Sequence, residues 1–357
     1  MTTRRMGRSI KRTALLAALA TTVVACGSGP AAPTQTPATV APTVVPTAAP
    51  TDSPSPTPGP SLGNVPAPGE AWIASQANFG IRLVRPDGTG EHMAFPMVPG
   101  GEQLHPDWSP DGDRLSFTVR GETDEIWIGD ADGSDPRKVV GCQDPCAWAD
   151  EAAWSPDGTS LIYQRMVSND GAGVSTLEIL DLATDTAHIV LTAPVGRAFY
   201  QPRWSPDGTQ VVTEFATMSG PAFDSDVIGV SLAIVDVGVT PPTLHELTRA
   251  DELTNSPDWS RATGLIVFAQ PNSAAGFDGP SDLVTMHPDG TGRTVVTSVG
   301  PRDGQTPQPA WSPDGSRIIF VRPDSTMATV AADGTDQAPA VLHDSTAGLH
   351  PRYRPIP

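Results

Sequence analysis

One short block of residues occurs five times in this sequence, each time around a tryptophan. The copies read PDWSPDGDRLSF, AAWSPDGTSLIY, PRWSPDGTQVVT, PDWSRATGLIVF and PAWSPDGSRIIF, and they contain Trp108, Trp154, Trp204, Trp259 and Trp311. These tryptophans follow one another at intervals of 46, 50, 55 and 52 residues. A repeat of about 40–50 residues is typical of a supersecondary unit that buries its apolar face only by packing on its neighbours. The intervals predict one four-stranded β-propeller blade per repeat.

The residues inside each repeat favour strands joined by tight turns. SPDG places proline at the second position of a turn and glycine where a positive φ is needed. β-branched and aromatic residues follow, as in 161–163 and 318–321, and a third strand is expected at 125–130, 177–181, 232–236 and 282–286. No long stretch has helical periodicity, so the sequence predicts an all-β fold.

The two ends of the repeat region complement each other. Residues 70–95 supply three strands of a blade but no WSPDG strand, and the chain finishes with HPRYRP, which places Tyr353 where the tryptophan would be. We therefore expect the C-terminal strand to complete the first blade. This gives a six-bladed β-propeller over residues 69–357 whose closure removes the exposed sheet edges.

The WSPDG block and the DxDG turn that follows it resemble the repeat of the TolB-like propellers. The resemblance covers nearly all of the chain after position 69, and five copies in register make it specific for the fold. Residues 260–264 depart from it, because they lack the Pro-Asp-Gly turn. The resemblance implies a binding module, and relatives of the repeat among carbohydrate-processing and peptidase-associated proteins imply an enzyme as the alternative.

The N-terminal segment has the pattern of an export signal. Basic residues precede an apolar run at 13–25 that is too short to span a bilayer, and Val23, Val24, Ala25 and Cys26 resemble a bacterial lipobox. We predict a signal peptide at 1–25, lipidation of Cys26, and a disordered Pro/Thr/Ala-rich tether at 26–68. The alternative is a plain signal peptide or an uncleaved membrane anchor. The lipoprotein interpretation places the propeller outside the cytoplasm, attached to the membrane only through its lipid.

Net charge restricts the partners. The chain carries a formal charge of -18, and loss of the basic signal peptide would make it -23. Such acidity disfavours nucleic acid, because phosphates are repelled. We expect a monomer that binds an envelope protein, peptide or glycan.

Two cysteines remain after Cys26. Cys142 and Cys146 lie in the loop GCQDPCAW, and in an exported protein this spacing predicts a disulfide. A zinc site, the alternative, would need more ligands than the nearby Asp144.

One column of the repeat is polar in every blade. The residues three positions before each aromatic are His350, His105, Glu151, Gln201, Ser256 and Gln308. We favour a hydrated channel, or hydrogen bonds between blades, as the role of this ring. The alternative is a divalent-metal site at His105, Glu151 and His350, which would serve a metal-assisted polysaccharide lyase or hydrolase. Because HExxH and P-loop motifs are absent, we predict a binding protein with no catalytic residue and no cofactor.

Overall fold

The computed structural model describes residues 66–67, 69–77, 80–95, 98, 101–222, 224–301, 306–335 and 349–356. The predicted signal peptide, Cys26 and nearly all of the predicted tether lie outside these residues. The described part of the chain is built from strands, with two short 3-10 turns at Ala250–Glu252 and Gly276–Asp278. Within that part, no helix has both the length and the apolar character needed to cross a membrane.

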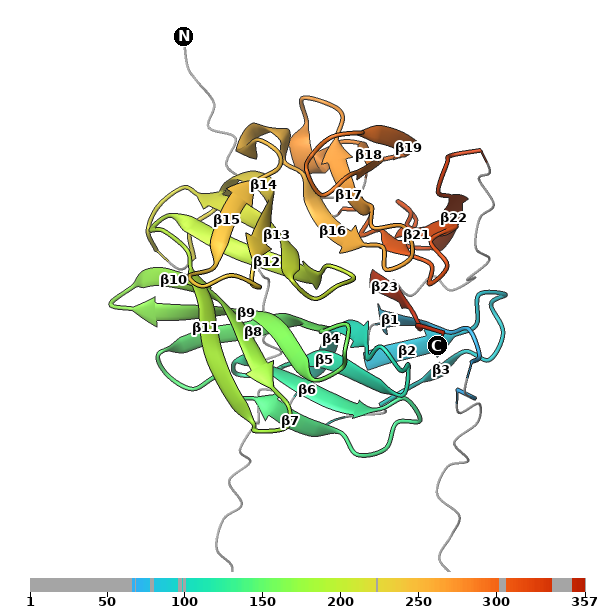
Figure 1. Cartoon of the computed structure of the whole chain (residues 1–357), viewed down its shortest axis with the longest axis horizontal. Coiled ribbons are helices and arrows are strands. Elements are labelled where there is room, and N and C mark those ends of the chain that lie inside the picture. The colour runs from blue at the N-terminus through green and yellow to red at the C-terminus, as the bar shows by residue number, and fades with distance from the viewer. Residues whose placement is uncertain are drawn as a thin grey trace, which may run out of the picture. The chain divides into compact units, whose positions relative to one another are not determined.

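The described strands pair in six consecutive antiparallel groups, which run from blue to red in Figure 1. The groups are: β1 (Ile73–Ala77), β2 (Gly80–Val84) and β3 (His92–Met93) with the C-terminal β23 (Leu349–Tyr353); β4 (Glu102–Trp108), β5 (Arg114–Arg120), β6 (Asp124–Asp130) and β7 (Arg137–Val140); β8 (Cys146–Trp154), β9 (Ser160–Asn169), β10 (Ala172–Asp181) and β11 (Thr186–Thr192); β12 (Arg197–Trp204), β13 (Gln210–Met218), β14 (Val227–Asp236) and β15 (Thr243–Glu246); β16 (Asn255–Trp259), β17 (Ile266–Pro271), β18 (Ser281–Met286) and β19 (Thr294–Val299); β20 (Ala310–Trp311), β21 (Arg317–Val321) and β22 (Met327–Ala331). One parallel bridge, Asp124 to Trp148, links the second group to the third.

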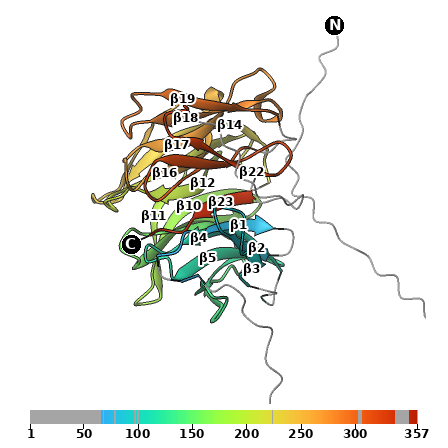
Figure 2. The same ribbon diagram turned by 90° about the vertical axis from the view of Figure 1, so that its right-hand side faces the viewer.

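The strands that end in the repeat aromatics form the inside of the fold, and we call them the inner strands. They contact one another in the order β4, β8, β12, β16, β20 and β23, and β23 contacts β4 in turn. β23 also pairs with β1, placing the last strand of the chain beside the first, as Figure 2 shows. This is the pairing that the HPRYRP sequence predicts.

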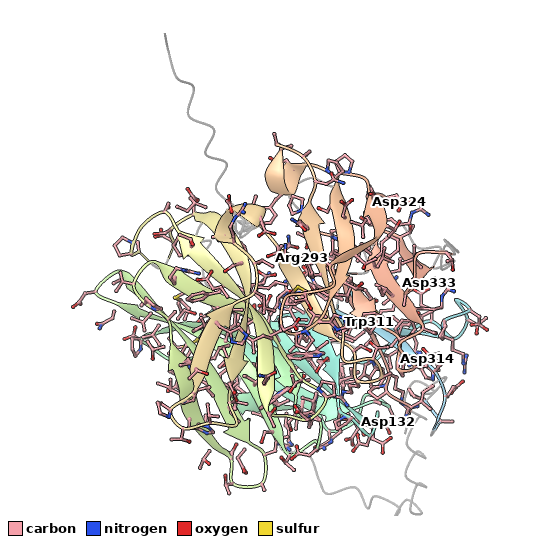
Figure 3. The ribbon with its side chains drawn as sticks, turned by 45° about the horizontal axis from the view of Figure 1, so that its top comes forward. Asp132, Arg293, Trp311, Asp314, Asp324 and Asp333 are labelled. Atoms are coloured by element: carbon pink, nitrogen blue, oxygen red, sulfur yellow. A yellow bond between two sulfur atoms is a disulfide. The ribbon has the colours of Figure 1, made fainter. Side chains whose placement is uncertain are left out.

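The turns after β4, β8, β12, β16 and β20 are fixed by their own side chains. In the fourth group Ser205 Oγ and the Thr209 amide donate to Asp207 Oδ1 at 2.6 and 3.1 Å, and Gly208 has a φ of 71°. At 260–264, where Pro-Asp-Gly is missing, Ser260 Oγ accepts the Thr263 amide at 3.1 Å and glycine comes one residue later. The turn therefore keeps its length with different chemistry. In Figure 3, Trp311 lies nearer the centre of the molecule than Asp324 and Asp333 in the turns of the last group.

The apolar core consists of clusters between neighbouring groups. Each of the six hydrophobic clusters contains buried residues of two adjacent groups. The cluster that joins the last group to the first contains Ile319, Met327, Ile73 and Val84. Because each blade face is covered only by the next blade, burial of apolar surface favours a ring. The count of six blades and the closure of the ring stay predictions, which these pairings and contacts support.

Candidate functional site

The polar column of the repeat occupies a strained backbone position in every group. His105, Glu151, Gln201, Ser256, Gln308 and His350 all have φ between 49° and 57°. Positive φ is uncommon for residues other than glycine and costs free energy. In five of the six groups the strand register shifts at this point, so the inner strand carries a bulge. Bulges of this kind often redirect a side chain near a functional site.

Acceptors from other side chains hold several of these bulges in place. The Gln201 amide donates to Glu151 Oε2 at 2.8 Å, and the His350 amide donates to Gln308 Oε1 at 2.9 Å. The Ser256 amide donates to Glu214 Oε1 at 2.7 Å. Each of these bonds joins one blade to the next, so the column links neighbouring blades.

His105 and Glu151 meet around a residue that the repeat comparison does not single out, Asp150. The Asp150 side chain is fully buried, and its Oδ1 accepts bonds from His105 Nδ1 at 2.6 Å, Thr118 Oγ1 at 2.6 Å and the Glu151 amide at 2.7 Å. Burial alone would lower the pKa of His105, but the Asp150 carboxylate outweighs it and raises that pKa above its usual value. This arrangement favours an imidazolium beside a buried carboxylate.

The neighbouring groups of this cluster are shifted in their own directions. Burial raises the pKa of Glu151, although the charge of His105 opposes the shift. The His350 ring lies edge-on to His105 with 4.3 Å between centroids, and burial followed by the charge of His105 lowers the pKa of His350 well below its usual value. Burial also raises the pKa of Glu214 to about 8. The inner strands and β13 therefore hold several titratable groups whose pKa values are displaced from those in water.

Among the described residues, His105, Asp150 and Glu151 form a group that could hold a metal ion, with potential ligand atoms within 4.8 Å of one another. Imidazole and carboxylate donors suit a divalent transition metal. His350 lies against His105 but is not part of this set. Hydrogen bonds within the cluster already engage Asp150 Oδ1.

A separate pocket lies at the aromatic ends of the inner strands. It has a volume of about 250 Å³, and the aromatics of all six groups line it: Trp108, Trp154, Trp204, Trp259, Trp311 and Tyr353. The residue directly before each aromatic lines it as well. The residues of that column carry a regular pattern of charge. The same alignment of the repeats contains this pattern, but a comparison of the residues three positions before each aromatic does not reveal it.

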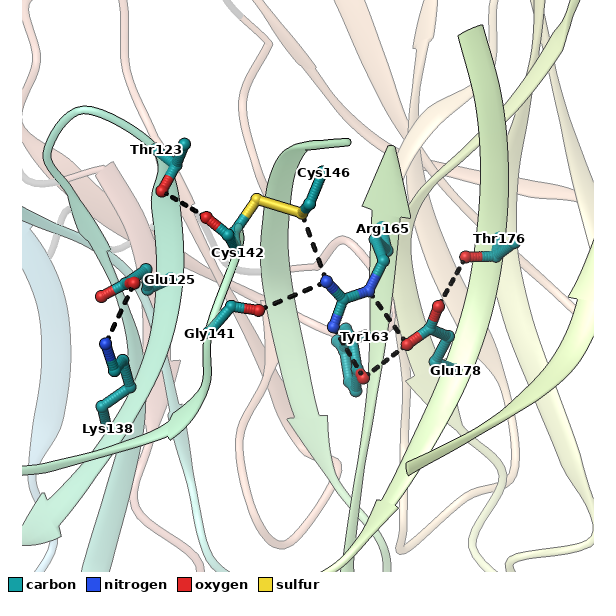
Figure 4. The surroundings of a disulfide bond; sticks show 10 residues. All are labelled: Thr123, Glu125, Lys138, Gly141, Cys142, Cys146, Tyr163, Arg165, Thr176 and Glu178. Atoms are coloured by element: carbon teal, nitrogen blue, oxygen red, sulfur yellow. Dashed lines mark hydrogen bonds and ion pairs between the residues drawn. A yellow bond between two sulfur atoms is a disulfide. The ribbon is translucent and has the colours of Figure 1, made fainter. Parts of the chain in front are cut away.

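Cys142 and Cys146 form a disulfide away from this pocket, shown in Figure 4. Arg165 contacts both the disulfide and Glu178. Its Nη1 lies 3.2 Å from Cys146 Sγ, and its Nε pairs with Glu178 at 3.1 Å. Thr123 Oγ1 donates to the Cys142 carbonyl at 2.9 Å. These contacts attach the disulfide loop to the second and third groups.

Solved structures resemble this fold, whereas no family model and no curated protein matches the sequence. TolB from Acinetobacter baumannii has a TM-score of 0.61 at 14% identity, over 80% of this chain and 67% of that one. A TolB of Agrobacterium tumefaciens has a TM-score of 0.55 at 17% identity, over 81% and 99%. An oligogalacturonate lyase in complex with manganese has a TM-score of 0.47 at 15% identity, over 76% and 74%. The two TolB structures show that the fold is a TolB-like β-propeller.

Proposed function

We propose that this TolB-like β-propeller is an extracytoplasmic binding module that engages a protein, peptide or glycan of the cell envelope. A lipid on Cys26 holds it at the membrane surface, and the 26–68 tether gives it a reach on the order of 100 Å. The observation that carries the proposal is the pocket of about 250 Å³ at the aromatic ends of the inner strands. Aromatic and arginine side chains on a rigid frame are the groups that most often dominate binding energy.

Site-specific photo-crosslinking in the full chain tests this function. Ile356 lines the pocket and is 47% exposed, so a photoreactive residue at that position would contact a bound partner. The control position is Ile189, which is 58% exposed on the edge strand β11. We expect a discrete adduct from position 356 in envelope preparations and none from position 189. Identical adducts from both positions, or none from 356, would reject the pocket as the binding face.

The cluster at His105, Asp150 and Glu151 favours a second candidate, a metal-assisted lyase or hydrolase acting on a polysaccharide. If a metal binds there, the unmodified protein should retain one equivalent of zinc or manganese after dialysis, and a His105→Ala/His350→Ala double variant should retain less. Acid should weaken binding, because protonated imidazole is no ligand. A His245→Ala variant, altered at an exposed histidine, serves as the control. Equal metal in the double variant and the unmodified protein would exclude this site.

A further inference from the structure

The column directly before the repeat aromatics has a regular charge pattern. In ring order it reads Arg352, Asp107, Ala153, Arg203, Asp258 and Ala310, which is the sequence Arg-Asp-Ala twice. All six residues line the pocket. Each charge therefore has a like charge three groups away around the ring, and the two alanines leave room between the pairs.

The two carboxylates are held by the backbone and use one oxygen each. Asp107 Oδ2 accepts the Trp154 amide at 3.0 Å, and Asp258 Oδ2 accepts the Trp311 amide at 2.8 Å. The other oxygens, Oδ1, lie 3.9 Å from Arg352 Nε and 4.0 Å from Arg203 Nε. These separations are too long for hydrogen bonds. The charges are therefore paired across neighbouring blades, while the Oδ1 atoms keep accepting capacity.

The guanidinium groups of Arg203 and Arg352 have a fixed orientation, but not all of their donors form hydrogen bonds. The side chains of Arg203 and Arg352 are 8% and 7% exposed. Their Nη1 atoms donate to the carbonyls of Pro202 and Pro351 at 2.8 and 3.2 Å, which fixes the direction of each group. Their Nε atoms are buried and have no hydrogen-bond partner among the described residues. Buried donors are nearly always bonded in folded proteins, so both guanidinium groups retain unused donor capacity.

Burial and the neighbouring charges shift the pKa values of Arg352 and Asp258. Burial, and then the charge of Arg203, lower the pKa of Arg352 to about 10, which leaves it a cation at pH 7. Burial raises the pKa of Asp258, and the charges of Arg352 and Arg203 oppose that shift. The four side chains together carry no net charge when all are ionised.

We infer that the pocket binds a free zwitterion of amino-acid or dipeptide size, with its carboxylate on Arg203 or Arg352 and its ammonium on Asp107 or Asp258. This inference rests on the proposed binding function and names the charge pattern of the ligand. A simple anion would meet two carboxylates that are only 16% exposed, and a simple cation would meet two guanidinium groups, so each would be repelled where a zwitterion is not. The volume of about 250 Å³ falls just below the range of about 300–1,000 Å³ for pockets that take drug-sized ligands.

Calorimetric titration of the full chain with matched dipeptides tests the charge requirement. The probes are glycyl-glycine and alanyl-alanine, their N-acetyl forms, which lack the ammonium, and their C-terminal amides, which lack the carboxylate. We expect at least one free dipeptide to bind in the millimolar range or tighter. Each blocked form should bind at least about tenfold more weakly, since it lacks one of the two charges that the pocket would bind. No binding by either free dipeptide, or equal binding of a blocked form, overturns the inference.

Paired substitutions locate the binding in the pocket. An Arg203→Met/Asp258→Asn variant removes one charge pair together, and the asparagine keeps an acceptor for the Trp311 amide. Free-dipeptide affinity should fall at least about tenfold. The matched control is Arg165→Met/Glu178→Gln, which removes an ion pair of similar burial in the third group, outside the pocket. An unchanged affinity in the pocket variant overturns the assignment. If that variant does not fold, the blocked dipeptides on the unmodified protein still decide.

A failure of the crosslinking experiment can be distinguished from a failure of the dipeptide experiment. A partner captured at position 356 with no dipeptide binding would retain the binding function and overturn the zwitterion. Dipeptide binding without a captured partner would retain the zwitterion and limit the function to small ligands.

Discussion

Removing the charge of Asp150 while keeping its shape tests the electrostatic account of the inner strands. An Asp150→Asn variant retains an acceptor at Oδ1 for Thr118 and Glu151, but it removes the negative charge beside His105. A hydrogen bond to a charged group contributes about 1.5–3 kcal/mol. We expect a loss of this size in the free energy of unfolding at about pH 5.5, where the unfolded histidine is largely protonated.

The loss should depend on pH in a defined direction. The folded protein raises the pKa of His105 above the 6.5 of the free side chain. The stabilisation is therefore fully present below about pH 6.5 and disappears as the pH rises through the folded pKa. The difference between unmodified protein and variant should consequently shrink toward pH 9. In addition to burial, the charge of Asp150 raises the pKa of Glu151, and the loss of this repulsion in the variant shifts the difference in the same direction. A weaker repulsion between His105 and His350 in the variant acts against it.

Urea denaturation at a series of pH values measures this difference directly. The control is Asp226→Asn, which removes an exposed aspartate whose side chain has no hydrogen bond among the described contacts. Its effect should be small at every pH. A loss for Asp150→Asn that stays constant or grows between pH 5.5 and 9 would refute the pairing of a protonated His105 with Asp150.

Three further predictions concern Glu214, the C-terminal strand and the predicted lipid on Cys26. Because burial raises the pKa of Glu214 from 4.5 to about 8, its contribution to stability is lost as the pH rises from about 4.5 to about 8, so Glu214→Gln should lessen the fall in melting temperature over that range. An equal fall in both proteins would contradict this. Deleting residues 348–357 exposes the edge of β1 and should cause aggregation or lower the melting temperature by roughly 10 °C or more; unchanged melting would exclude closure by the C-terminal strand. A Cys26→Ser protein should leave the membrane fraction, and its retention there after signal cleavage would rule out the lipid.

The sequence by itself determined the repeat and therefore the fold. Five WSPDG-type blocks define where inner strands end and turns begin, since turn chemistry and β propensity are local properties. The same alignment placed His105, Glu151 and His350 at one equivalent position, and the structure gives all three the same left-handed backbone. The disulfide loop and the role of HPRYRP were equally accessible from the sequence.

Only the tertiary structure decided which of these side chains meet. Asp150 has no special place in the repeat, yet it is the acceptor around which His105, Thr118 and Glu151 gather. The bulge in five of the six inner strands breaks the alternation of side chains, so the side chains that point inward can no longer be predicted from the two-residue period of a strand. The pairing of Arg352 with Asp107, 245 positions apart, likewise depends on the last strand lying beside the second blade. Equivalent positions come from the repeat, whereas contacts between blades depend on the ring that brings distant residues together.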